Sequence, residues 1–158
     1  HHKSSTPISW GKAKEKEMHY ATHIRLWLCM SGFVFLLLRF SKADVGTAAQ
    51  YSAPYIPTQC YGSDVSQIPS SNMFAAAGDA IWDNGASCGR QYSVKCLSAT
   101  VAGACANDQI IQVKIVDYAG SLVSPPSSAG ATLVLSTAAF GALTKTYANA
   151  INVEFQQV

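Results

Sequence analysis

The stretch at residues 74–96, FAAAGDAIWDNGASCGRQYSVKC, decides the fold of this chain. Asp83-Asn84-Gly85 is a sharp turn signal within it, because Asn and Gly adopt positive φ at little cost. The residues before that turn, 72–82, predict either a short helix or a strand followed by a turn. The residues after it, 91–96, alternate polar and apolar side chains and predict a strand.

Similar short segments recur on both sides of this stretch. They combine small, β-branched and aromatic residues, and turn residues separate them. The predicted strands cover 46–51, 91–96, 110–116, 131–135 and 151–155. A helix is expected to start at Ser136 as its N-cap, and 121–130, with two prolines and four serines, is expected to be a surface loop. Many short strands with one or two short helices predict a small β-barrel.

The N-terminal part has a different character. Residues 26–38 form a run of 13 nearly all apolar residues, preceded by basic residues and followed by Ser41-Lys42-Ala43. This pattern is typical of a secretory signal peptide, which we expect over residues 18–43. Residues 1–17 are interpreted as upstream sequence that is not native, because the first methionine is Met18. The working domain is therefore expected at 44–158.

The predicted domain at 44–158 carries four basic and seven acidic residues, a net charge of −3. It lacks the basic patch that nucleic acid or an anionic membrane requires, so neither is expected as a partner once the signal peptide is removed. All four histidines precede residue 44, which excludes a histidine base or metal ligand in this domain. We expect a monomer with no metal and no cofactor.

Four cysteines lie in the predicted domain: Cys60, Cys88, Cys96 and Cys105. An even number in an exported chain predicts two disulfides. Three pairings are possible, and the spacing alone does not choose among them.

Motifs across 46–158 together resemble the plant natriuretic peptides, also described as blight-associated, expansin-like secreted proteins. The motifs that carry the resemblance are Gly46-Thr47-Ala48, Tyr51, Cys60-Tyr61-Gly62, Trp82-Asp83-Asn84-Gly85, Cys88-Gly89, Val113 to Tyr118, Leu135-Ser136 and Ile151 to Phe155. The resemblance implies a six-stranded double-psi β-barrel in the apoplast, with Cys60–Cys88 and Cys96–Cys105 pairing. A third bridge of the family is missing, so the loop at 121–130 is expected to be freer.

The resemblance also implies where a polysaccharide site would be. Asp117 matches a groove aspartate of related barrels, and Tyr118 and Tyr51 are aromatic neighbours on which a sugar ring could stack. Hydrolysis needs a second carboxylate, and the related endoglucanases and expansins supply it where this chain has Val134. We therefore predict no enzyme activity, and an alternative function as a non-hydrolytic module that binds or loosens cell-wall polysaccharide.

The leading prediction is a different function, that of a secreted signalling protein. Members of the family that the chain resembles are credited with effects on water and ion balance. The predicted function includes these effects and a role in stress or defence responses. The segment from Phe74 to Cys96 is the candidate contact with a plasma-membrane receptor, through Asp83, Asn84 and Arg90. Trp82 is expected to be a core residue that anchors the turn.

Overall fold

The structure is a computed structural model that describes residues 11–37 and 42–158. The chain divides into two compact units, one ending at Phe40 and the other beginning at Ser41. The first unit contains helix α1 (Gly11–Leu37). Among the described residues, no helix combines the length and apolar character needed to cross a membrane. Residues 1–10 and 38–41 of the predicted upstream and signal segments lie outside the described residues, and both segments stay predictions.

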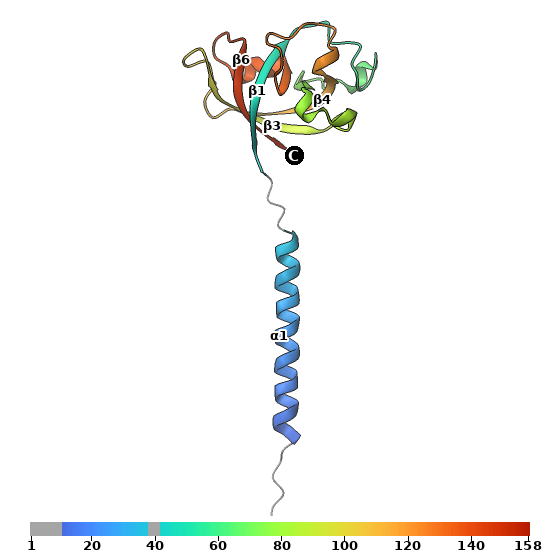
Figure 1. The fold of residues 1–158 in the computed structure, drawn as a ribbon, viewed down its shortest axis with the longest axis vertical. Coiled ribbons are helices and arrows are strands. Elements are labelled where there is room, and N and C mark those ends of the chain that lie inside the picture. The colour runs from blue at the N-terminus through green and yellow to red at the C-terminus, as the bar shows by residue number, and fades with distance from the viewer. Residues whose placement is uncertain (1–10, 38–41) are drawn as a thin grey trace, which may run out of the picture. The chain divides into compact units, whose positions relative to one another are not determined.

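The second unit is a closed barrel of six strands (Figure 1). The strands are β1 (Asp44–Tyr51), β2 (Phe74–Ala77), β3 (Gln91–Ala99), β4 (Ile110–Tyr118), β5 (Leu133–Ser136) and β6 (Ala150–Gln157). Their order around the barrel is β1-β5-β2-β4-β3-β6. The pairs β1–β5 and β2–β4 are parallel, and the other four are antiparallel. The predicted six-stranded double-psi barrel is confirmed.

Alternation along the strands explains how the barrel closes around a core. Ile151, Val153 and Phe155 of β6 are buried, while Asn152 and Glu154 between them are exposed. Successive side chains of a strand point to opposite faces, so this pattern fills the interior from every second residue. Residues 72–82 form β2 and then the short helix α2 (Asp79–Trp82), so each of the two predicted alternatives is correct for part of the segment.

A second apolar cluster lies on the other face of β1, β5, β2 and β4. Tyr51, Phe74, Ala76 and Val134 belong to it, whereas the alternating residues of the same strands belong to the interior core. Tyr55, Tyr61, Ile68, Ala119 and Leu122 pack against it. The segments at 52–72 and 119–131 therefore cover this side of the barrel and bury residues that point outward from the strands.

Both disulfides form as the resemblance implied, Cys60–Cys88 and Cys96–Cys105. The turn after α2 includes the 3₁₀ helix η2 (Asp83–Gly85), in which Asn84 and Gly85 have positive φ as the sequence predicts, and Asp83 has positive φ as well. The predicted cap is also present, because the Ser136 hydroxyl accepts a hydrogen bond from the Ala139 amide at the start of α3 (Thr137–Leu143).

The loop at 121–130 has anchors in place of the missing third bridge. The Ser127 hydroxyl accepts from the Gln50 amide at 2.9 Å and donates to the Asn149 carbonyl at 2.6 Å. The Ser124 hydroxyl donates to the Pro54 carbonyl at 2.9 Å. Two of the four serines in this loop thus tie it to neighbouring segments. The expectation of a freer loop rested on the missing bridge alone and left these hydrogen bonds out.

Candidate functional site

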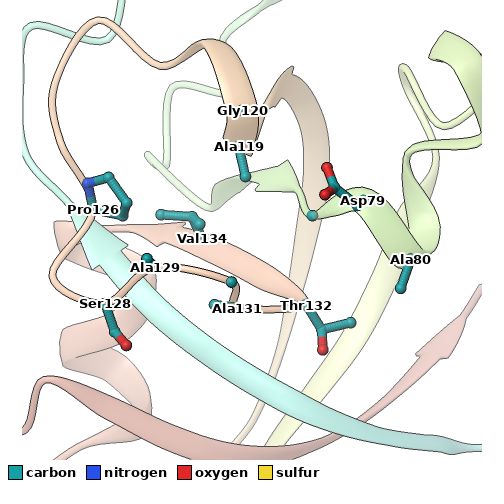
Figure 2. A pocket seen from close by; sticks show the side chains of 12 residues that line it. Asp79, Ala80, Ala119, Gly120, Pro126, Ser128, Ala129, Ala131, Thr132 and Val134 are labelled. Carbon is teal, nitrogen blue, oxygen red and sulfur yellow. The ribbon is translucent and has the colours of Figure 1, made fainter.

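An open cavity of about 430 Å³ lies on the side of the barrel where β5 is covered by the neighbouring segments. We call it the barrel groove. Its lining comes from Gly78–Ala80, Ala119–Gly120, Pro126, Ser128–Thr132 and Val134. Figure 2 shows Val134 between Pro126 and Asp79 in this view. The lining is made mostly of glycine, alanine, serine and threonine, so a ligand could approach the backbone closely.

Gly78 fixes one wall of the barrel groove by allowing β2 to pass close to the segment before β5. The Gly78 amide donates to the Thr132 carbonyl at 2.9 Å. A Cβ added at Gly78 would lie 2.2 Å from the Ala131 carbonyl oxygen, far inside a normal contact. A glycine is therefore required here for its size, and it places Asp79 directly at the groove.

Asp79 is the charged residue among those that line the barrel groove. Its Oδ1 accepts a hydrogen bond of 2.6 Å from the Tyr118 hydroxyl. The Tyr118 ring stacks on Trp82 with a centroid distance of 4.9 Å and an interplanar angle of 27°. The hydrogen bond to Asp79 raises the pKa of Tyr118, so the phenol keeps its proton and stays a donor.

Asp117 lies at the end of β4 and is buried, with 1% of its surface exposed. Its Oδ1 accepts from the amides of Gln59 and Tyr118, both at 2.8 Å. Its Oδ2 is buried without a hydrogen-bond partner among the described residues. Burial raises the pKa of Asp117, and the two amide hydrogen bonds oppose that shift.

Tyr51 is also buried, with 1% of its surface exposed. Its ring makes edge-to-face contacts with Tyr55 and Phe74 at centroid distances of 4.9 and 6.3 Å. Its hydroxyl, like Asp117 Oδ2, is buried without a partner in the described part of the chain. Burial, and next the charge of Asp117, raise the pKa of Tyr51. Of the three predicted groove residues, Asp117 and Tyr51 thus lie beneath the surface, and Tyr118 is half-buried; none is among the lining residues.

Val134 lines the barrel groove at the position where the related endoglucanases were expected to carry a second carboxylate. Its register partners are Ala49 on β1 and Ala76 on β2, so it is flanked by small apolar side chains. Such surroundings would not stabilise a charge. Within the described ranges, no three His, Cys, Asp or Glu residues come together in a way that could hold a metal ion.

A family model described as lytic transglycolase matches residues 74–155. An EG45-like domain containing protein of Citrus jambhiri is 36% identical over 127 residues, which cover 78% of this chain and 88% of that protein. The chain belongs to the expansin-like, EG45-like family of double-psi β-barrels. A putative EG45-like domain containing protein of Arabidopsis thaliana is 35% identical and covers 79% of this EG45-like chain and 92% of its own length.

The fold of this EG45-like chain is also found in a bacterial expansin. The structure of a mutant expansin of Clavibacter michiganensis in complex with cellohexaose aligns with a TM-score of 0.54 and 21% identity. The match covers 74% of this chain and 50% of that expansin, so the EG45-like chain spans half the length of the bacterial protein. At this identity the likeness establishes the fold.

The predicted receptor contacts of the EG45-like chain lie together on a separate turn. Arg90 forms a salt bridge with Asp83, with 2.7 Å between Arg90 Nη2 and Asp83 Oδ2, and it is the Asp83 hydrogen bond that raises the pKa of Arg90. Asn84 is exposed beside them. None of the three is among the residues lining the barrel groove, and their role in receptor binding stays a prediction.

Sequence reasoning did not identify Asp79 and Trp82 as site residues. Trp82 packs against the interior core, as predicted, but it is only partly buried and supports Tyr118. Asp79 directly follows Gly78 at the end of the buried strand β2. An acidic residue in this place is a local signal that could have marked Asp79 as a candidate site residue. Its partner Tyr118 is 39 residues away and reaches it because β2 and β4 pair in parallel.

Proposed function

We propose that this EG45-like protein is a non-hydrolytic module that binds plant cell-wall polysaccharide in the barrel groove. The observation that carries the proposal is the lining, in which Asp79 is the charged side chain and Val134 occupies the position expected for a second carboxylate. An open site with small side chains and a few polar groups suits a glycan, whose hydroxyls need acceptors. The relatives with EG45-like domains and the cellohexaose in the expansin complex support this class of ligand.

The same geometry is the argument against hydrolysis. Glycosidases place two carboxyl groups on either side of the bond that breaks, one acting as acid and the other as base or nucleophile. Asp117 has the raised pKa that suits an acid, but it is 1% exposed and its Oδ1 already accepts two amide hydrogen bonds. Val134 can neither donate nor accept a proton.

The signalling function predicted first from the sequence has less support. The relatives are named for EG45-like domains, and the comparisons with known proteins leave natriuretic activity and the receptor as predictions. An extracellular location fits both functions, because two disulfides persist in an oxidising compartment. The alternative predicted from the sequence, wall binding without chemistry, is therefore the proposed function.

Retention on isolated cell walls tests this proposal. The oxidised protein is mixed with insoluble cellulose and with depectinated wall material, and the bound fraction and the released reducing sugar are measured together. We expect saturable retention with no more reducing sugar than in a protein-free control. No retention on either material would refute the binding function, and release of sugar in proportion to protein would refute its non-hydrolytic character.

A further inference from the structure

One acidic side chain faces a groove that has no basic residue in its lining. The Asp79 carboxylate is exposed at the groove, and the other lining residues are uncharged. The barrel unit as a whole also carries more acidic than basic residues. A polysaccharide in the barrel groove therefore meets a negative charge that nothing in the lining compensates.

We propose that Asp79 is the specificity-determining residue of the barrel groove, which accepts hydroxyls of neutral polysaccharides and excludes polyuronates. This inference rests on the proposed function, since it names the class of glycan that the same groove takes. The chemistry is direct. A carboxylate accepts hydrogen bonds from several hydroxyl donors, whereas it repels the carboxylates that a polyuronate carries on each residue.

The position of Asp79 is fixed on both sides. Gly78 holds its backbone against the segment 131–132, and the Tyr118 hydroxyl binds its Oδ1 at 2.6 Å. Tyr118 is in turn held by the stack on Trp82. It also lies against Gly120, where an added Cβ would be 2.5 Å from the tyrosine ring. A carboxylate with so few available orientations loses little freedom when a ligand binds, which favours affinity.

Asp79 also keeps acceptor capacity for a ligand. A carboxylate offers about four lone-pair sites, and Tyr118 occupies one of them. Ser128 and Thr132 also belong to the lining (Figure 2), and the Thr132 hydroxyl, which accepts a hydrogen bond of 3.2 Å from the Thr47 amide, can still donate one. The site thus offers acceptors and hydroxyls, which match the hydroxyls of a neutral sugar. It offers no cation for a uronate.

The test is affinity electrophoresis in native gels that contain soluble mixed-linkage β-glucan or polygalacturonate, with each mobility referred to a polysaccharide-free gel. The variants are Asp79→Asn, which removes the charge, and Tyr118→Phe, which removes the hydrogen bond and keeps the ring. Asp108→Asn is the matched control. It makes the same charge change at an exposed position outside the groove lining, and its positive φ suits Asn.

We expect the wild-type protein and Asp108→Asn to be retarded by β-glucan and not by polygalacturonate. Asp79→Asn should bind β-glucan about tenfold more weakly, the loss of one hydrogen bond to a charged group, and should discriminate less against polygalacturonate. Tyr118→Phe should bind β-glucan with an affinity between those of the wild-type protein and Asp79→Asn, because Tyr118 acts only by holding Asp79 in position. Near-ultraviolet circular dichroism checks that each variant is folded.

The outcomes separate this inference from the function on which it rests. If the wild-type protein binds neither polysaccharide and is not retained on cellulose or depectinated wall material, the proposed function fails; retention on those materials without binding to β-glucan would overturn this inference alone. If it binds β-glucan and Asp79→Asn behaves as Asp108→Asn does with both polysaccharides, the groove binds glycan but Asp79 does not determine its specificity. Stronger retardation of the wild-type protein by polygalacturonate than by β-glucan would overturn the proposed selectivity.

Discussion

At the scale of single residues, two of the residues that the sequence placed in a groove carry a buried polar atom. Asp117 Oδ2 and the Tyr51 hydroxyl have no hydrogen-bond partner among the described residues, and the charge of Asp117 raises the pKa of Tyr51. Unpaired buried polar atoms cost stability. Asp117 compensates in part by accepting the amides of Gln59 and Tyr118, which join the covering segment to the end of β4. Its structural role is therefore independent of any ligand.

The raised pKa of Asp117 predicts how stability depends on pH. A carboxyl whose pKa is raised on folding favours the folded state below its ordinary value of 3.8, and that contribution is lost as pH rises through the raised value. Asp117→Asn cannot titrate, so its stability relative to the wild-type protein should increase as pH rises from about 3.5 to 7. Urea unfolding of both proteins across this range measures the difference.

Asp64 provides a control of opposite sign for that experiment. Hydrogen bonds from Ser66 lower the pKa of Asp64, so its contribution is present above the ordinary value and is lost as pH falls. Asp64→Asn should therefore lose stability relative to the wild-type protein as pH rises. Parallel curves for the wild-type protein and Asp117→Asn would show that burial does not perturb Asp117.

At the scale of elements, the junction of β2 and α2 determines the barrel groove. Gly78→Ala would place a Cβ 2.2 Å from the Ala131 carbonyl oxygen, and backbone must move to relieve the contact. We expect a loss of about 2 kcal/mol or more in the free energy of unfolding, in the range of overpacked sites. Denaturant unfolding measures it.

Gly141 offers the matched control for that change. It lies in α3, and an added Cβ would meet nothing within 4 Å. Gly141→Ala should be neutral or stabilise the protein by up to about 1 kcal/mol, as expected for a helix interior. An equally small effect of Gly78→Ala would mean that the close approach at the groove is not required.

The elements also show which features the sequence could predict. Alternation at 151–155 and at 91–96 predicted β6 and β3, and Ser136 predicted the start of α3, because each signal is local. Asp117 and Tyr51 were expected at a surface groove, but both are buried: apolar residues of the segment at 52–72 pack against the cluster that contains Tyr51, and the Gln59 amide of that segment binds Asp117. The Asp79–Tyr118 contact depends on parallel pairing of distant strands, which no local pattern reveals.

At the scale of the whole molecule, the barrel is closed by six strands and linked by two disulfides of different span. Cys60 and Cys88 are 28 residues apart, and Cys96 and Cys105 are 9 apart. A cross-link stabilises more when it closes a longer loop. Replacing the first pair with Ala should therefore cost about 1 kcal/mol more in the free energy of unfolding than replacing the second. Urea unfolding of the two double variants tests this, and an equal or reversed order would contradict it.

The central claim is that the barrel groove binds wall polysaccharide without cleaving it. Ala129 is exposed and lines the groove, so Ala129→Trp would fill the groove without disturbing the core. Ala138 is exposed on α3 outside the lining, and Ala138→Trp adds the same ring there.

Binding isotherms of the three proteins on depectinated wall material are therefore the decisive measurement. We predict saturable binding of the wild-type protein and of Ala138→Trp, with affinity lowered about tenfold or more in Ala129→Trp, the equivalent of about 1.4 kcal/mol. Equal binding by all three proteins, or no binding by the wild-type protein, would contradict the claim.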